Sequence, residues 1–216
     1  MRTKTLLLTA ALSAAGLLSA SAQTAVYSVN IVGYINKTLG TGLSLIANQL
    51  NATPDNSVPT LFGTPAGSVT VSKFNKSRGN FDSAVYDPDS GWSLPTGGMV
   101  LNPGQAAFVD NSTGANLPLT FVGEVQLNST VNVVTGLEAY SSVIPQAGDL
   151  NAIQFPVPGG SMSFSKFNGR TFDTSVFDPD SGWSPSIPSV AVAEGFFIDN
   201  ASGAPITWTR SFSVGP

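Results

Sequence analysis

The sequence predicts an all-β protein in which two tandem homologous repeats, each a β-sandwich-like or partly open barrel unit, follow a cleaved signal peptide. Short segments of alternating apolar and polar residues recur along the chain, and clusters of Gly, Pro, Asn, Asp and Ser separate them. The second half of the chain repeats the first, and no convincing helical stripe follows residue 22. The expected boundaries are 1–22 for the signal peptide, 23–125 for the first repeat and 126–216 for the second.

The N-terminal segment has the composition of an export signal. Arg2 and Lys4 provide a basic start, Leu6–Leu18 form an apolar stretch, and Ala20–Ala22 supply the small-x-small pattern of a cleavage site. The apolar stretch is shorter than the roughly 20 residues that a membrane-spanning helix needs. We therefore expect cleavage before Gln23 and no membrane span in the mature chain.

The composition excludes several classes of function. The 216 residues include no cysteine and no histidine, which rules out disulfides, thiolate nucleophiles, Ser-His-Asp triads and histidine-ligated metals. Loss of Arg2 and Lys4 leaves 7 basic residues against 13 acidic ones, a net charge of −6. Such a chain repels phosphate backbones, so we expect no nucleic-acid partner. The expected location is periplasmic, cell-surface or extracellular.

Four matching segments, in the same order in both halves, define the internal repeat. The longest match joins Val85–Ser93 to Val176–Ser184, with eight of nine residues identical. The other three join Ser72–Asn75 to Ser165–Asn168, Phe81-Asp82 to Phe172-Asp173, and Phe108–Asn111 to Phe197–Asn200. Their spacing indicates a duplicated unit of about 90 residues.

Period-two alternation is clearest at Tyr27–Asn36 and at Ile206–Val214, and both are expected strands. The other expected strands are residues 43–47, 69–74, 106–109, 117–122, 131–134, 139–144 and 162–167. An exposed edge on the last strand would permit self-association by strand addition.

The segments Gly42–Asn48, Tyr86-Asp87-Pro88 and Asn102–Val109 occur in an order that resembles a β-rich module of exported bacterial surface proteins. Tyr27–Tyr34 likewise resembles the start of small exported two-repeat proteins of this family, which have no assigned function. Two positions depart from the pattern. Gln49 stands where proline is usual, and the second repeat has Ala-Tyr-Ser-Ser at residues 139–142 in place of the Leu-Ile-x-Asn core. The resemblance implies fold and export, and it implies no catalytic residue.

The repeated Asp-Pro-Asp-Ser-Gly-Trp loop is the first candidate site. Asp87 and Asp89, and their counterparts Asp178 and Asp180, could converge on calcium, since paired carboxylates suit a hard cation. Asp, then Pro, then a Gly that accepts positive φ also describes a hairpin turn that needs no ion. The turn explains more of these residues, but it does not require the second aspartate.

Two tryptophans next to these loops form the second candidate site. Trp92 and Trp183, with Tyr86 and Phe177 six residues earlier in each copy, could stack on sugar rings while the nearby carboxylates bind hydroxyl groups. The alternative is that each tryptophan packs its hairpin onto the core.

We therefore expect an exported, non-enzymatic structural or adhesive β-domain protein of the cell envelope or extracellular matrix, with an envelope or matrix protein or a polysaccharide as partner. The alternative is a carbohydrate-binding module assisted by calcium. No other cofactor is expected. A third hypothesis is a carboxylate-dependent glycoside hydrolase, which would have to use the aspartates of these loops and hairpins. Those aspartates are residues 82, 87, 89, 173, 178 and 180.

Two further patterns have competing explanations. Five Asn-x-Ser/Thr sequons would carry glycans in a eukaryotic secretory pathway, and in a bacterium they reflect a polar surface. They lie at Asn36, Asn51, Asn111, Asn128 and Asn200. The repeated Lys73 and Lys166 are expected to face solvent, or to pair with Asp82 and Asp173 of their own repeat.

Overall fold

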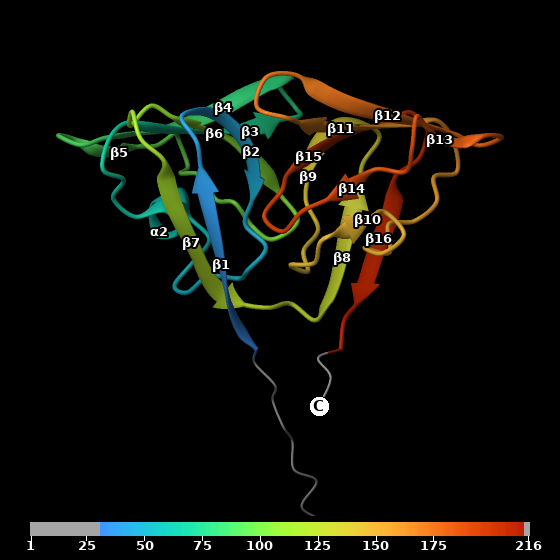
Figure 1. Cartoon of the computed structure of the whole chain (residues 1–216), viewed down its shortest axis with the longest axis horizontal. Coiled ribbons are helices and arrows are strands. Elements are labelled where there is room, and N and C mark those ends of the chain that lie inside the picture. Colours follow the sequence, from blue (N-terminus) through green and yellow to red (C-terminus); the bar gives the residue numbers. More distant parts are fainter. Residues whose placement is uncertain (1–30, 214–216) are drawn as a thin grey trace, which may run out of the picture. The chain divides into compact units, whose positions relative to one another are not determined.

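Two five-stranded antiparallel sheets account for most of the structure, a computed structural model in which residues 31–213 are described (Figure 1). Strands make up 51% of the described residues and helix 3%, which confirms the all-β prediction. The expected signal peptide and the first residues of the alternating Tyr27–Asn36 segment lie outside the described residues. Within residues 31–213, no helix has the length and apolar character needed to cross a bilayer.

Sheet I has the strand order β2-β6-β3-β4-β5. Its strands are β2 (Gly42–Ala47), β3 (Val69–Asn75), β4 (Asn80–Asp87), β5 (Gly91–Ser93) and β6 (Ala106–Asn111). Sheet II has the order β9-β15-β11-β12-β13. Its strands are β9 (Gly136–Tyr140), β11 (Met162–Phe167), β12 (Phe172–Asp178), β13 (Gly182–Ser184) and β15 (Phe196–Asn200).

The remaining strands form three two-stranded sheets. In one, β1 (Val32–Leu39) pairs with β7 (Leu117–Glu124) along the full length of both strands. In another, β8 (Asn128–Val133) pairs with β16 (Ile206–Ser211). The third joins the short strands β10 (Gly148–Asp149) and β14 (Ser189–Val190). A single turn of helix, α2 (Val58–Phe62), begins after the capping side chain of Ser57.

Each five-stranded sheet packs on a two-stranded one, because alternate residues of the strands face a shared core. In β7, Leu117, Leu119 and Phe121 are buried and the intervening residues are exposed. They pack with residues on the inner face of sheet I, among them Val69 and Val71. A second core lies under sheet II, where Trp208 of β16 packs with Phe164 and Phe196. This layering fits the predicted β-sandwich-like architecture.

Sheets I and II are joined by buried side-chain and backbone hydrogen bonds. The amide of Gln49, which is fully buried, donates to the carbonyl of Ser142 at 2.9 Å, and its oxygen accepts from the amide of Ala193 at 2.8 Å. Gln49 stands where the module that the sequence resembles usually has proline. Proline could form neither of these bonds, so the departure has a structural role. Strand β9 ends at Tyr140, earlier than predicted, and the next residue, Ser141, instead donates its amide to the carbonyl of Gly104 at 3.0 Å.

Two of the sequons form turn caps. Asn111 is 1% exposed, and its amide donates to the carbonyls of Leu39, Gly40 and Ala115 at 3.3, 3.0 and 2.8 Å. The hydroxyl of Thr113 donates to Asn111 Oδ1 at 2.7 Å, so the third residue of the sequon completes the cap. Asn200 makes the corresponding bonds after β15. At these two positions the motif therefore has a local structural cause.

Candidate functional site

The Asp-Pro-Asp loops are closed by their own backbone amides. Asp87 Oδ1 accepts from the amides of Asp89 and Ser90 at 3.0 and 3.1 Å, and from the Ser90 hydroxyl at 3.2 Å. These bonds favour the charged carboxylate and lower the pKa of Asp87. The geometry is that of an Asx turn. One carboxylate oxygen of the first aspartate is therefore engaged within the turn.

The second loop has the same geometry. Asp178 Oδ1 accepts from the amides of Asp180 and Ser181 at 3.0 and 3.1 Å, and from the Ser181 hydroxyl at 3.1 Å. The pKa of Asp178 is lowered by the same bonds. Among residues 31–213, the structure brings together no group of three or more acidic side chains that could hold a metal ion. Calcium at these loops stays a prediction.

The two candidate tryptophans lie at the edges of the cores. Trp92 is half-buried, packs on Tyr86 at a ring-centroid distance of 5.3 Å, and donates its indole N–H to the carbonyl of Gly63 at 2.7 Å. Trp183 is also half-buried and packs on Phe177 at 5.3 Å. Tyr86 and Phe177 are both 7% exposed. Each tryptophan thus contacts the core with one part of its ring and leaves another part accessible beside an aspartate loop.

A closed circuit of six phenylalanine rings lies where sheets I and II meet. Each ring contacts the next edge-on, with centroid distances of 5.3–5.8 Å and interplanar angles of 61–87°. In order around the circuit, the rings are Phe74, Phe81, Phe108, Phe167, Phe172 and Phe197. Three come from each sheet. Edge-to-face contacts of this kind are favourable beyond the area they bury.

Strand register places these rings. Phe74 of β3 is directly opposite Phe81 of β4, and Phe167 of β11 is directly opposite Phe172 of β12. Because side chains alternate along a strand, Phe74 lies on the face of sheet I opposite to the buried Val71. The circuit is therefore separate from the two sandwich cores.

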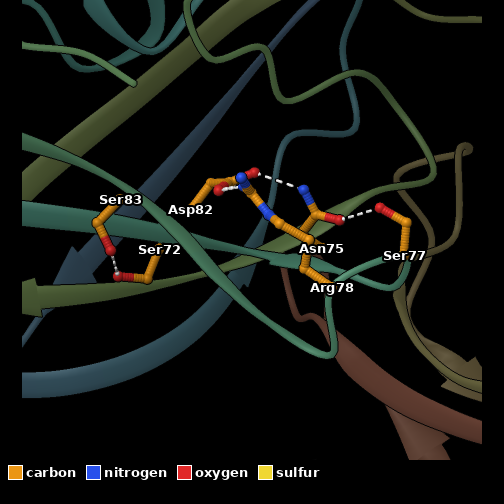
Figure 2. Close-up of polar contacts among 6 residues, drawn as sticks. All are labelled: Ser72, Asn75, Ser77, Arg78, Asp82 and Ser83. Carbon is orange, nitrogen blue, oxygen red and sulfur yellow. Dashed lines mark hydrogen bonds and ion pairs between the residues drawn. The ribbon is translucent and has the colours of Figure 1, made fainter. Parts of the chain in front are cut away.

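The hairpin that carries Phe74 and Phe81 is held by polar contacts at its tip (Figure 2). The Asn75 amide donates to Asp82 Oδ2 at 2.8 Å, and the Ser77 hydroxyl donates to Asn75 Oδ1 at 2.7 Å. Arg78 forms an ion pair with Asp82. These contacts fix the turn between the two strands and hence the position of both rings.

A hydroxyl pair lies on the outer face of each of these hairpins. Ser72 and Ser83 share a hydrogen bond of 2.8 Å across β3 and β4, as Figure 2 shows. Ser165 and Thr174 share one of 2.8 Å across β11 and β12. Each of these hydroxyls therefore has a hydrogen-bond partner within its own sheet.

The six rings line a hollow of about 620 Å³ that opens to solvent. Besides the six rings, Leu43, Leu137, Ser165 and Thr174 line it, and none of the lining residues is charged. Phe81 is 44% exposed and Phe172 46%, while Phe108 and Phe197 beneath them are 8% and 6% exposed. We name this feature the phenylalanine hollow. Its volume lies within the range of small-molecule and side-chain pockets.

The phenylalanine hollow could have been found from the internal repeat of the sequence, although the strand patterns alone do not indicate it. All six phenylalanines fall in the segments that recur between the two halves of the chain. A residue repeated outside the core pattern of its strand is a candidate for contact between the halves. No family model matches the chain, and it has no match among curated proteins or solved structures.

The repeated lysines do not follow the expectation. Lys73 donates to the carbonyl of Val100 at 2.9 Å and to Gln105 Oε1 at 2.8 Å, and Lys166 pairs with Glu194 at 3.3 Å. Both side chains are half-buried. Asp82, the expected partner of Lys73, is engaged at the hairpin tip instead. Cross-strand register places Lys73 opposite Asp82, but the lysine extends toward the loop before β6.

Proposed function

We propose that this chain is an exported, non-enzymatic binding protein of structural or adhesive kind, in the cell envelope or extracellular matrix, with the phenylalanine hollow as its contact surface. The observation that carries the proposal is the exposure of Phe81 and Phe172 above a layer of buried rings. Contiguous exposed apolar surface on a folded protein usually marks a site of interaction. An apolar group from a protein or matrix partner would bury both rings on binding.

Two homologous repeats are part of this proposal. The strands of sheet I and sheet II correspond in order, β2 with β9, β6 with β15, β3 with β11, β4 with β12 and β5 with β13. The flanking pairs β1–β7 and β8–β16 correspond as well. This agreement supports a duplication, and under it each repeat supplies one half of the hollow. Among residues 31–213, β8 is the strand that pairs with β16, and it pairs with one side of it. Self-association through the other side of β16 stays a prediction.

The state of the aspartates supports a non-enzymatic role over the glycoside hydrolase hypothesis. A glycosidase needs one carboxyl whose pKa is raised, so that it can donate a proton. Asp87 and Asp178 are exposed, and their pKa values are shifted the opposite way. Asp82 is held in an ion pair with Arg78. None of these three carboxyls has the environment of a general acid.

The carbohydrate-binding alternative is favoured by one observation. Trp92 and Trp183 both keep part of their rings accessible next to Asp87 and Asp178. A partly exposed indole beside oxygen atoms is the arrangement that stacks on a sugar ring. Under this alternative the phenylalanine hollow would serve only to join the repeats.

The test compares the purified chain with two double variants for retention on agarose beads carrying alkyl chains. We expect Phe81→Ser with Phe172→Ser to abolish retention. The matched control is Val85→Ser with Val176→Ser, because these valines are 39% and 43% exposed on the same two strands but lie outside the hollow. Equal loss of retention in both double variants would contradict the proposal. Retention on unmodified agarose, a polysaccharide, would favour the carbohydrate alternative.

Export is tested separately. Expression of the full chain in a bacterium, followed by fractionation and mass spectrometry, should give a product outside the cytoplasm that begins at Gln23. A cytoplasmic product that retains Met1 would contradict export and would leave the hollow itself unaffected.

A further inference from the structure

A second cavity, of about 340 Å³, lies between β3 and the chain around β8 and β9. Its wall has one cation and one anion, Lys73 and Glu138, together with apolar side chains that include Phe74 and Val131. Both charged side chains are half-buried. A charged side chain that is partly removed from water loses solvation free energy unless a group of opposite charge or a hydrogen-bond partner compensates it.

The equivalent lysine in sheet II has a carboxylate in direct contact, which Lys73 lacks within residues 31–213. Lys166 pairs with the carboxylate of Glu194 at 3.3 Å. Gln105 occupies the place of Glu194, and it offers Lys73 a neutral carboxamide oxygen at 2.8 Å. Gln105 Oε1 also accepts from the amide of Asn102 at 3.0 Å. Glu194 Oε2, which lies 3.4 Å from Lys166 Nζ, accepts from the amide of Ala191 at 2.7 Å. The two sites therefore share their geometry and differ by one negative charge.

Lys73, which lines the cavity, keeps unused bonding capacity. An ammonium group has three donors. Two of them are accounted for by the carbonyl of Val100 and by Gln105, both neutral. Burial lowers the pKa of Lys73, and the charge of Glu138 acts against this shift. In the part of the chain that the structure describes, the ion pairs are Arg78–Asp82 and Lys166–Glu194, and neither includes Lys73 or Glu138.

We propose that this cavity binds a small zwitterion with an apolar side chain, of the free α-amino acid class. The ligand's carboxylate accepts the remaining Lys73 donor, its ammonium group lies toward Glu138, and its side chain packs on Phe74 and Val131. A simple anion would be repelled by Glu138, and a simple cation by Lys73. A wholly apolar ligand would leave both charges desolvated. Glu138 accepts from the amide of Ala139 at 3.0 Å and, among the described residues, has no bond to a cation, so a ligand with both charges complements Lys73 and Glu138 together.

The first test is calorimetric titration of the purified chain with L-leucine. Two analogues each keep one charge: 4-methylpentanoate has the carboxylate and 3-methylbutylamine the ammonium group. We expect saturable binding of leucine with a Kd of about 1 mM or below, and both analogues about tenfold weaker or more. No saturable heat with leucine, or equal binding of all three compounds, would overturn the proposal.

The second test exploits the difference between the two lysine sites. Gln105→Glu recreates the ion pair of Lys166, and we expect it to weaken leucine binding about tenfold, because Lys73 then has a carboxylate partner. The matched control is Glu194→Gln, which should leave binding unchanged. If Gln105→Glu does not fold, as judged by its thermal unfolding, Lys73→Met provides the same test. Unchanged affinity in the folded variant would overturn the proposal. Alkyl-bead retention should not change in these variants, so this inference and the function proposed for the phenylalanine hollow fail independently.

Discussion

Phe108 and Phe197 lie with ring centroids 6.0 Å apart and an interplanar angle of 33°. They occupy corresponding places on β6 of sheet I and β15 of sheet II. Each is nearly buried, and the more exposed rings of the phenylalanine hollow rest on them. This pair forms the floor of the hollow, and it also joins the two sheets. We therefore expect the two floor rings to contribute mainly to stability and the exposed rings mainly to binding.

Phe108→Ala should destabilise the protein by about 3–5 kcal/mol, as loss of a buried ring usually does. Phe172→Ala should cost only about 1 kcal/mol, because that ring is 46% exposed. Urea unfolding followed by circular dichroism measures both values. Equal losses in the two variants would mean that the rings do not form a buried floor and an exposed rim.

The cap formed by Asn111 supports a second prediction. Asn111→Ala would remove the amide that three carbonyls accept, among them that of the buried Leu39, so we expect a loss of about 2 kcal/mol or more. Asn128 is an exposed sequon residue, and Asn128→Ala should change stability by about 0.5 kcal/mol or less. Thermal or urea unfolding of the two variants provides the comparison. Similar stability in both would show that the cap is dispensable.

The aspartate turns predict a pH dependence. The pKa values of Asp87 and Asp178 are lowered chiefly by hydrogen bonds from backbone amides in the loop. These hydrogen bonds therefore stabilise the fold fully at a pH above 3.8, the ordinary pKa of an aspartate. The stabilisation is lost as the pH falls through the lowered pKa values of the folded state. Carboxyl carbon shifts recorded by NMR during acid titration should place both midpoints below 3.8. Midpoints at or above that value would contradict the turn geometry. A rise in either pKa would be needed for the hydrolase hypothesis.

Tryptophan emission tests the carbohydrate alternative. Trp208 is 1% exposed and donates to the carbonyl of Ile153, so it should not respond to any added ligand. If the hollow is the contact surface, emission from Trp92 and Trp183 should stay constant when soluble polysaccharide or calcium is added. A saturable shift that disappears in Trp92→Phe with Trp183→Phe would instead favour a carbohydrate-binding module.

The strands that the sequence predicts correctly are those whose pattern lies within one short segment. Strands with clear alternation, such as Leu117–Val122 and Met162–Phe167, were predicted within a few residues of their observed ends. Strands β4 and β12 were not predicted, because Asp, Ser and Asn in them are typical of loops. In the structure some of these polar side chains bond to a partner across the hairpin, as Ser83 does to Ser72. Such pairing depends on the register of the two strands, which composition does not reveal.

The candidate sites show the same limit. The aspartate loops and their tryptophans are consecutive in sequence, so their local geometry could be anticipated. The hollow unites Phe74 with Phe197 and Phe108 with Phe167, pairs that lie far apart in the chain. The alternation of residues along one strand does not predict that the phenylalanine-bearing faces of sheets I and II will contact each other. The internal repeat does contain this information, because each phenylalanine of the hollow recurs at the matching position of the other half.

The central claim is that the phenylalanine hollow binds apolar groups, and ring-resolved NMR tests it most directly. The chain would be labelled with ¹³C in its phenylalanine rings and titrated with 1-hexanol. We predict concerted, saturable shifts for Phe81 and Phe172, with no change for Phe62 and Phe121, which pack against each other in the core under sheet I. Unchanged Phe81 and Phe172 signals, or equal shifts of all four, would contradict a binding role for the hollow.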